Sequence, residues 1–369
     1  MTTLSDKAFN SLIVTEGWRD TIYKDIVGIP TVGMGVALLV KNAEKKFIFR
    51  SDLKGTAEKL GLNWENCESA LEDARDVLNG IEGKTNPFKT ATQLLDKKTN
   101  EAESEKYGHT NQTEFKKLLW PKLYNEYLSI VRVRVGGFGV WNRLSLDEQT
   151  AMFSMCYNSP SLVGNTLKNS LILYTEDGMK RTDTELTDSQ FVGKLHSWFT
   201  ILYASNGNNV YGLQNRRFFE ANEFLGKIPT QMPLFNNAKS VLEVDNDRQA
   251  AIAVAYMNQR KTVAHNKMNA VTGYNRDPYK YLQENFTPAI KRFLESQGHD
   301  KPYDISKLFK EWNLLNDLEI NTSTGAVTYK KEVTGGDKDL IFKTQEEKPK
   351  EADKKPTSIL PIDTKKYYA

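Results

Sequence analysis

A helix that ends in glycine and runs directly into a glycine-rich strand segment constrains this sequence most strongly. Residues 5–15 place Phe9 and Leu12 on one helical face, and Gly17 suits the end of that helix. The following stretch, 21–39, alternates β-branched residues with glycine and proline, which favours short strands joined by turns. The sequence therefore predicts a helix followed by a small β-hairpin or sheet.

Three polar side chains fall at the turning points of this helix and hairpin. Glu16 stands at the helix end, Asp25 follows nine residues later, and Thr31 follows six residues after that, where the chain returns. In glycosidic cleavage, one carboxyl group protonates the leaving oxygen while a second stabilises positive charge or activates water, which a hydroxyl can help to hold. We interpret the three residues as candidate catalytic groups that converge on one cleft. Solvated surface charges are the alternative for the two carboxylates.

The order of residues around this set resembles a known family. The runs TEGWRDTIYKD and TVGMG are similar to the N-terminal signature of the phage-type lysozymes, glycoside hydrolase family 24, which carries Glu, Asp and Thr at the same spacing before Gly-x-Gly. Residues 144–171 resemble the central helix of that family and the turn after it, and residues 212–225 resemble its closing Gly-Leu-x-x-Arg-Arg helix. The three blocks occur in the family's order.

The resemblance implies both a fold and an activity. The fold is α+β, a mainly helical lysozyme-like domain with a small N-terminal sheet. The activity is hydrolysis of the β-1,4 bond between N-acetylmuramic acid and N-acetylglucosamine in peptidoglycan. Glu16 is implied as the general acid, Asp25 as the second carboxylate and Thr31 as the residue that positions water. No metal or organic cofactor is implied, because acid-assisted sugar cleavage needs none.

Further residues of the matching blocks are candidates for contact with the sugar. Tyr157, Asn158 and Thr166 are candidate substrate-binding residues, with core packing and helix termination as their alternative roles. Arg216 and Arg217 are expected to be structural or wall-binding rather than catalytic. The substrate partner implied is the peptidoglycan glycan strand.

The chain departs from the family pattern in three places. Val36 stands where many members have His after Gly-x-Gly, and Ser159 and Pro160 follow Asn158 in place of Gly. Residues 40–110 replace a shorter connection and are polar and mostly helical in pattern. A lid, a docking surface and a block over the cleft are the alternatives for this insertion.

The length of the chain, 369 residues, exceeds what such a domain needs. We divide it into a lysozyme-like catalytic domain at 1–226 that carries the helical insertion at 40–110, and a mostly helical C-terminal extension at 227–333. The extension ends in a hairpin around a Thr-Gly turn at 318–333. A charged, Pro-containing tail occupies 334–369.

Composition excludes several classes of protein. Lys plus Arg total 50 against 47 Asp plus Glu, a balance that argues against nucleic acid as a partner. Two cysteines, Cys67 and Cys156, exclude a disulfide scaffold and are expected to be free thiols. No apolar run of about 18 residues occurs, so no membrane insertion is expected. The N-terminus lacks signal-peptide features, so we expect synthesis in a host cytoplasm without a signal peptide.

These expectations combine into three functional hypotheses. We expect a peptidoglycan hydrolase carried in a phage virion or tail, which acts on the host periplasm and cell wall during infection and contacts phage structural proteins through the C-terminal extension. A free phage endolysin for host lysis is the second hypothesis. A non-enzymatic structural tail protein on a lysozyme fold is the third.

Overall fold

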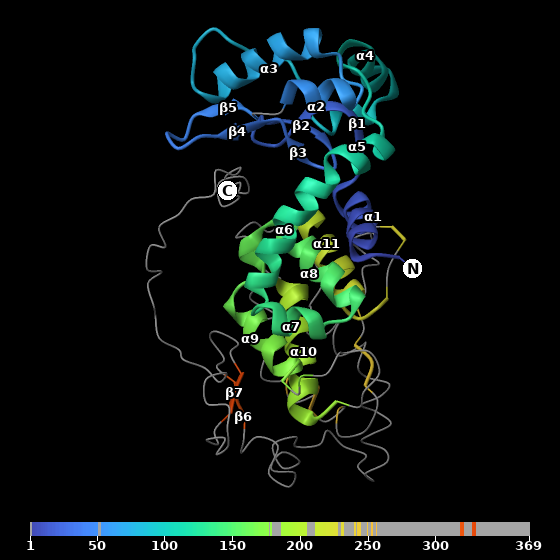
Figure 1. Ribbon diagram of the computed structural model, residues 1–369, viewed down its shortest axis with the longest axis vertical. Helices are drawn as coiled ribbons and strands as arrows, with labels where there is room; N and C mark the ends of the chain where they lie inside the picture. Colours follow the sequence, from blue (N-terminus) through green and yellow to red (C-terminus); the bar gives the residue numbers. More distant parts are fainter. Residues whose placement is uncertain are drawn as a thin grey trace.

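The computed structural model describes residues 2–50, 53–176, 178, 186–204 and 211–227, scattered positions between 230 and 256, and the strand residues 318–320 and 327–329. Within these residues the fold is α+β, mostly helical with small antiparallel sheets. Figure 1 shows two lobes, one containing the N-terminal sheets and the other a bundle of helices, with α6 running from one toward the other. The expected fold class is therefore confirmed at this level.

The small lobe is built around the predicted N-terminal sheet. Three strands pair antiparallel in the order β1-β2-β3, and Thr31 in β2 lies opposite Tyr23 in β1 and Ala37 in β3. Gly33, at φ +64°, lies against the ring of Phe115, so a side chain at this position has no room. The bounds of these strands are Arg19–Lys24, Pro30–Gly33 and Val36–Ala37.

The segment 40–110 forms the rest of this lobe. It is mostly helical as expected, but it begins with a two-stranded antiparallel hairpin, β4 and β5, that the polar composition did not predict. Helix α4 packs against β1, and the amide of Thr110 donates a hydrogen bond to the carbonyl of Asp20. The elements are β4 (Leu39–Lys41), β5 (Phe47–Phe49), α2 (Leu53–Lys59), α3 (Trp64–Leu78), η1 (Gln93–Leu95) and α4 (Lys97–Tyr107), and α5 (Gln112–Leu118) follows the segment.

The helical lobe surrounds one buried helix. Helix α8 contacts α1, α6 and α11, and nine of its 13 residues are buried. A capping box fixes its start, because Ser145 and Glu148 satisfy each other's backbone amides. The elements of this lobe are α1 (Leu4–Glu16), α6 (Trp120–Arg134), α7 (Phe138–Arg143), α8 (Leu146–Asn158), η2 (Pro160–Leu162), α9 (Asn165–Tyr174), α10 (Asp188–Tyr203) and α11 (Tyr211–Phe224).

Two further expectations can be compared with the structure. Strands β6 (Leu318–Ile320) and β7 (Val327–Tyr329) pair antiparallel within 318–333, where a hairpin is expected, and the residues of its expected Thr-Gly turn lie outside the described residues. Cys67 and Cys156 are buried and free, as expected. Most of the extension 227–333 and the whole tail 334–369 lie outside the described residues. No helix in the described ranges has the length and apolar character needed to cross a membrane.

Candidate active site

A pocket opens between the two lobes, and five of the six predicted site residues line it. Glu16, Asp25 and Thr31 all face it, together with Tyr157 and Asn158 from the end of α8. The small lobe supplies one wall from β1, β2, β3 and the β1–β2 turn, and α6 and α8 supply the other.

Thr166 does not line this pocket. After Asn158 the chain forms η2 and then enters α9, where Thr166 is the second residue. Helix α9 packs against α10. Thr166, which was expected to contact the sugar, therefore lies in the helical lobe away from the pocket lining.

Glu16 is the last residue of α1, and a buried arginine fixes the orientation of its carboxyl group. Gly17, at φ +74°, ends the helix in a conformation that glycine favours. Oε1 of Glu16 is ion-paired and hydrogen-bonded to Nη1 of Arg216, whose side chain is 3% exposed, whereas that of Glu16 is 22% exposed. Oε2 has no hydrogen-bond partner among the described residues. One carboxyl oxygen is therefore anchored and the other is available.

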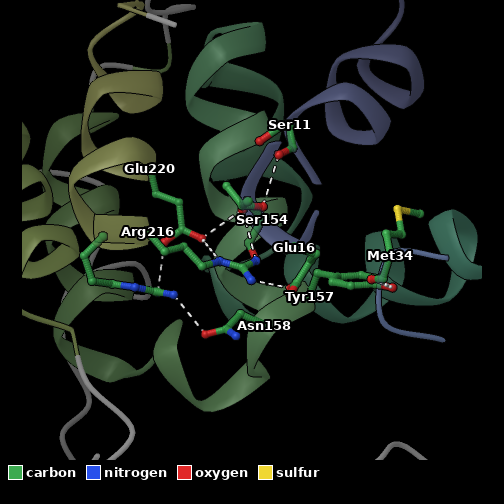
Figure 2. Close-up of polar contacts among 10 residues, drawn as sticks. Ser11, Glu16, Met34, Ser154, Tyr157, Asn158, Arg216 and Glu220 are labelled. Atoms are coloured by element: carbon green, nitrogen blue, oxygen red, sulfur yellow. Dashed lines mark hydrogen bonds and ion pairs between the residues drawn. The ribbon is translucent and has the colours of Figure 1, made fainter. Parts of the chain in front are cut away.

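Arg216 belongs to a buried polar network on α11 (Figure 2). Its Nε donates to Oε1 of Glu220 at 2.9 Å, and its Nη2 donates to the carbonyl of Ser154 at 2.9 Å. Ser154 Oγ also donates to Glu220, at 2.8 Å. Burial lowers the pKa of Arg216, but the charges of Glu16 and Glu220 outweigh that effect and raise it above its usual value.

Arg217 connects the same network to the end of α8. Its Nη2 donates to Oδ1 of Asn158 at 2.9 Å, and its Nη1 forms an ion pair with Oε2 of Glu220 at 2.9 Å. The two arginines therefore share Glu220, while Arg216 also holds Glu16 (Figure 2). The amide oxygen of Asn158 is committed to this network, so only its Nδ2 can serve as a donor toward the pocket.

Asp25 opens the tight turn between β1 and β2. Its Oδ1 accepts hydrogen bonds from the amides of Val27 at 3.0 Å and Ile29 at 2.8 Å. Burial raises the pKa of Asp25, although these backbone hydrogen bonds and a further one from Gly28 oppose that shift. The turn therefore places a partly desolvated carboxyl group at the pocket with one oxygen fixed.

Thr31 is buried at the centre of β2, and its hydroxyl hydrogen is already used. Oγ1 donates to the carbonyl of Ile29 at 2.9 Å. The oxygen still has lone pairs that can accept a hydrogen bond. A water molecule in the pocket can therefore donate to Thr31, which orients the lone pairs of that water away from the hydroxyl.

An aromatic wall completes the side of the pocket that α6 and α8 form. The rings of Tyr127 and Tyr157 lie with centroids 4.8 Å apart, and the hydroxyl of Tyr157 donates to the carbonyl of Met34 at 3.4 Å. Burial raises the pKa of both phenols. Tyrosine rings beside polar groups suit the apolar faces and hydroxyl groups of a sugar.

Tyr127 and Arg50 are among the pocket-lining residues that the sequence prediction did not include. Tyr127 lies four residues after Leu123 on α6, so both residues share one helical face, and both line the pocket. The sequence does not say where α6 lies, so it could not predict that this face lines the pocket. Arg50, directly after β5, also lines it. Val36 is a buried apolar part of the lining.

The described residues contain no cluster of three or more His, Cys, Asp or Glu side chains that could hold a metal ion. Fold and site together define an α+β protein with an interlobe pocket that contains two carboxyl groups. Comparison of the chain with family models, curated proteins and solved structures gave no match.

Proposed function

We propose that this protein is a peptidoglycan hydrolase that cleaves the β-1,4 bond between N-acetylmuramic acid and N-acetylglucosamine. The observation that carries the proposal is the convergence of Glu16, Asp25 and Thr31 on one pocket, at the spacing of the phage-type lysozyme signature. Two carboxyl groups and a hydroxyl are the groups that glycoside hydrolysis requires.

In the proposed mechanism, Glu16 is the general acid. Its free oxygen, Oε2, protonates the glycosidic oxygen while Arg216 holds the opposite oxygen in place. Because Arg216 also serves Glu220, Glu16 is not its sole counter-ion.

Asp25 and Thr31 act on the other reaction partners. In its ionised form, Asp25 stabilises positive charge at the sugar ring or takes a proton from attacking water. Thr31 accepts a hydrogen bond from that water. The Tyr127 and Tyr157 rings pack against the sugar and exclude bulk solvent.

Product analysis tests the proposed bond specificity. Purified peptidoglycan is digested, the new reducing ends are reduced with borohydride, and the reduced sugar is identified by mass spectrometry after acid hydrolysis. We expect muramitol as the only new reduced sugar. Glucosaminitol would indicate cleavage of the other glycosidic bond, and new amino groups without new reducing ends would indicate peptide or amide cleavage.

We further propose that the protein is part of a phage particle, because every residue that lines the pocket precedes α11 and the long chain beyond α11 has no assigned role in the proposed reaction. Quantitative mass spectrometry of gradient-purified virions tests this. We expect a fixed number of copies for each particle that withstands high-salt washing. Absence from particles, with the protein free in the lysate, would instead favour the endolysin alternative.

A further inference from the structure

Arg50 brings a positive charge into a pocket that otherwise holds carboxyl groups. Among the described residues that line the pocket, it alone has a cationic side chain. Its Nη1 donates to the carbonyl of Ala37 at 3.5 Å, and Ala37 is itself part of the lining. The segment 40–110, for which the sequence left three roles open, therefore contributes directly to the site.

Glu126 on α6 is a candidate partner for Arg50 within the protein. Glu126 lies on α6 between the lining residues Leu123 and Tyr127. Burial raises the pKa of Glu126, and the positive charges of Arg50 and Lys122 oppose that shift. A purely structural interaction of Arg50 with Glu126 is thus the competing explanation for its position.

The charges in the pocket give Arg50 a second role. Arg216 offsets the charge of Glu16, whereas Asp25 has no ion pair with a cationic side chain among the described residues, so its ionised form disfavours the approach of an anionic polymer. Arg50 is the cationic group of the lining that can attract such a polymer. A guanidinium group matches a carboxylate in both charge and fork geometry.

We propose that Arg50 binds a carboxylate of the substrate and thereby selects peptidoglycan over a neutral N-acetylglucosamine polymer. This inference rests on the proposed function. Peptidoglycan strands have a carboxylate on the lactyl group where the stem peptide is missing, and on the stem peptide where it is present. Chitin has neither group. The charge of Arg50 therefore distinguishes two polymers whose backbones share the same β-1,4 linkage.

Binding measurements test the proposal without turnover. Glu16→Gln is the background, and Arg50→Gln, Arg50→Lys or the exposed control Arg134→Gln is added to it. Calorimetry measures Kd for peptide-free muramyl oligosaccharides, for stem-peptide-bearing oligosaccharides and for chito-oligosaccharides of equal length. We expect Arg50→Gln to weaken at least one carboxylate-bearing ligand by about tenfold or more and to leave the chito-oligosaccharide unchanged. Arg50→Lys should recover part of the loss, and Arg134→Gln should have no effect.

The pattern of losses identifies the source of the carboxylate. Weakening for peptide-free strands identifies the lactyl group, and weakening confined to peptide-bearing strands identifies the stem peptide. Equal weakening of all three ligands, or of none, overturns the proposal. Hydrolysis by the wild-type protein is measured separately, so selective binding without any hydrolysis would contradict the proposed function and leave the role of Arg50 intact.

Discussion

Replacing Arg216 with methionine tests the buried network that orients Glu16. Methionine keeps an unbranched side chain but removes the charge and four hydrogen bonds, which join Arg216 to Glu16, Glu220 and two oxygens of Ser154. Breaking a buried ion pair costs about 3–5 kcal/mol. Two features favour the lower end of this range. Arg217 still neutralises Glu220, and the 22% exposed side chain of Glu16 can be solvated by water.

We therefore expect Arg216→Met to lower the free energy of unfolding by about 3 kcal/mol. Urea titration followed by tryptophan fluorescence measures this, because Trp120, Trp141 and Trp198 are buried in the helical lobe. Adding Glu220→Gln to Arg216→Met completes a double-mutant cycle. We expect the double variant to lose at least about 1 kcal/mol less than the sum of the two single variants. A single-variant cost below about 1 kcal/mol, or strictly additive costs, would refute the reasoning.

Three other predictions concern stability. Burial raises the pKa of Glu223 to about 8. The folded protein therefore keeps a proton that the unfolded chain releases near pH 4.3. As the pH rises from about 5 to 8, the free energy of unfolding should fall by up to about 1.4 kcal/mol per pH unit. Glu223→Gln should remove this component in urea titrations at pH 5, 6, 7 and 8, and an unchanged slope would contradict the assignment. Gly33→Ala should lower the free energy of unfolding by about 2 kcal/mol, because the new Cβ would lie 2.8 Å from the ring of Phe115 at a φ of +64°. The control Gly17→Ala also has a positive φ but open space around the new Cβ, so it should lower the free energy of unfolding by about 1 kcal/mol. Equal losses for the two variants would exclude the steric explanation. Ser145→Ala should cost about 1 kcal/mol by removing the cap of α8, and an unchanged urea midpoint would contradict that role.

The convergence of three polar side chains on one pocket could be predicted from the local sequence. Glu16, Asp25 and Thr31 lie within 16 residues, and a helix end, a tight turn and a returning strand suffice to bring them together. Glycine conformations also act locally, which is why the end of α1 at Gly17 could be predicted from the sequence.

Contacts between distant segments could not be predicted in this way. Arg216 contacts Glu16, which is 200 residues away in the sequence. Arg50 lines the pocket from the end of a hairpin that the polar composition of 40–110 did not predict. The first contact depends on how α1 and α11 both pack against α8, and the position of Arg50 depends on how the end of the β4–β5 hairpin lies against β3. Thr166 was predicted to contact the substrate but does not line the pocket. The turn after α8 leads the chain into α9, where Thr166 lies.

The most direct test compares wild-type protein, Glu16→Gln and the exposed control Glu68→Gln on purified peptidoglycan, with new reducing ends counted over time. A general acid contributes about 10²–10⁴-fold to the rate. The account predicts that Glu16→Gln lowers the rate by at least about 100-fold and that Glu68→Gln matches wild type. Equal rates for wild type and Glu16→Gln, or no reducing ends from any of the three proteins, would contradict it.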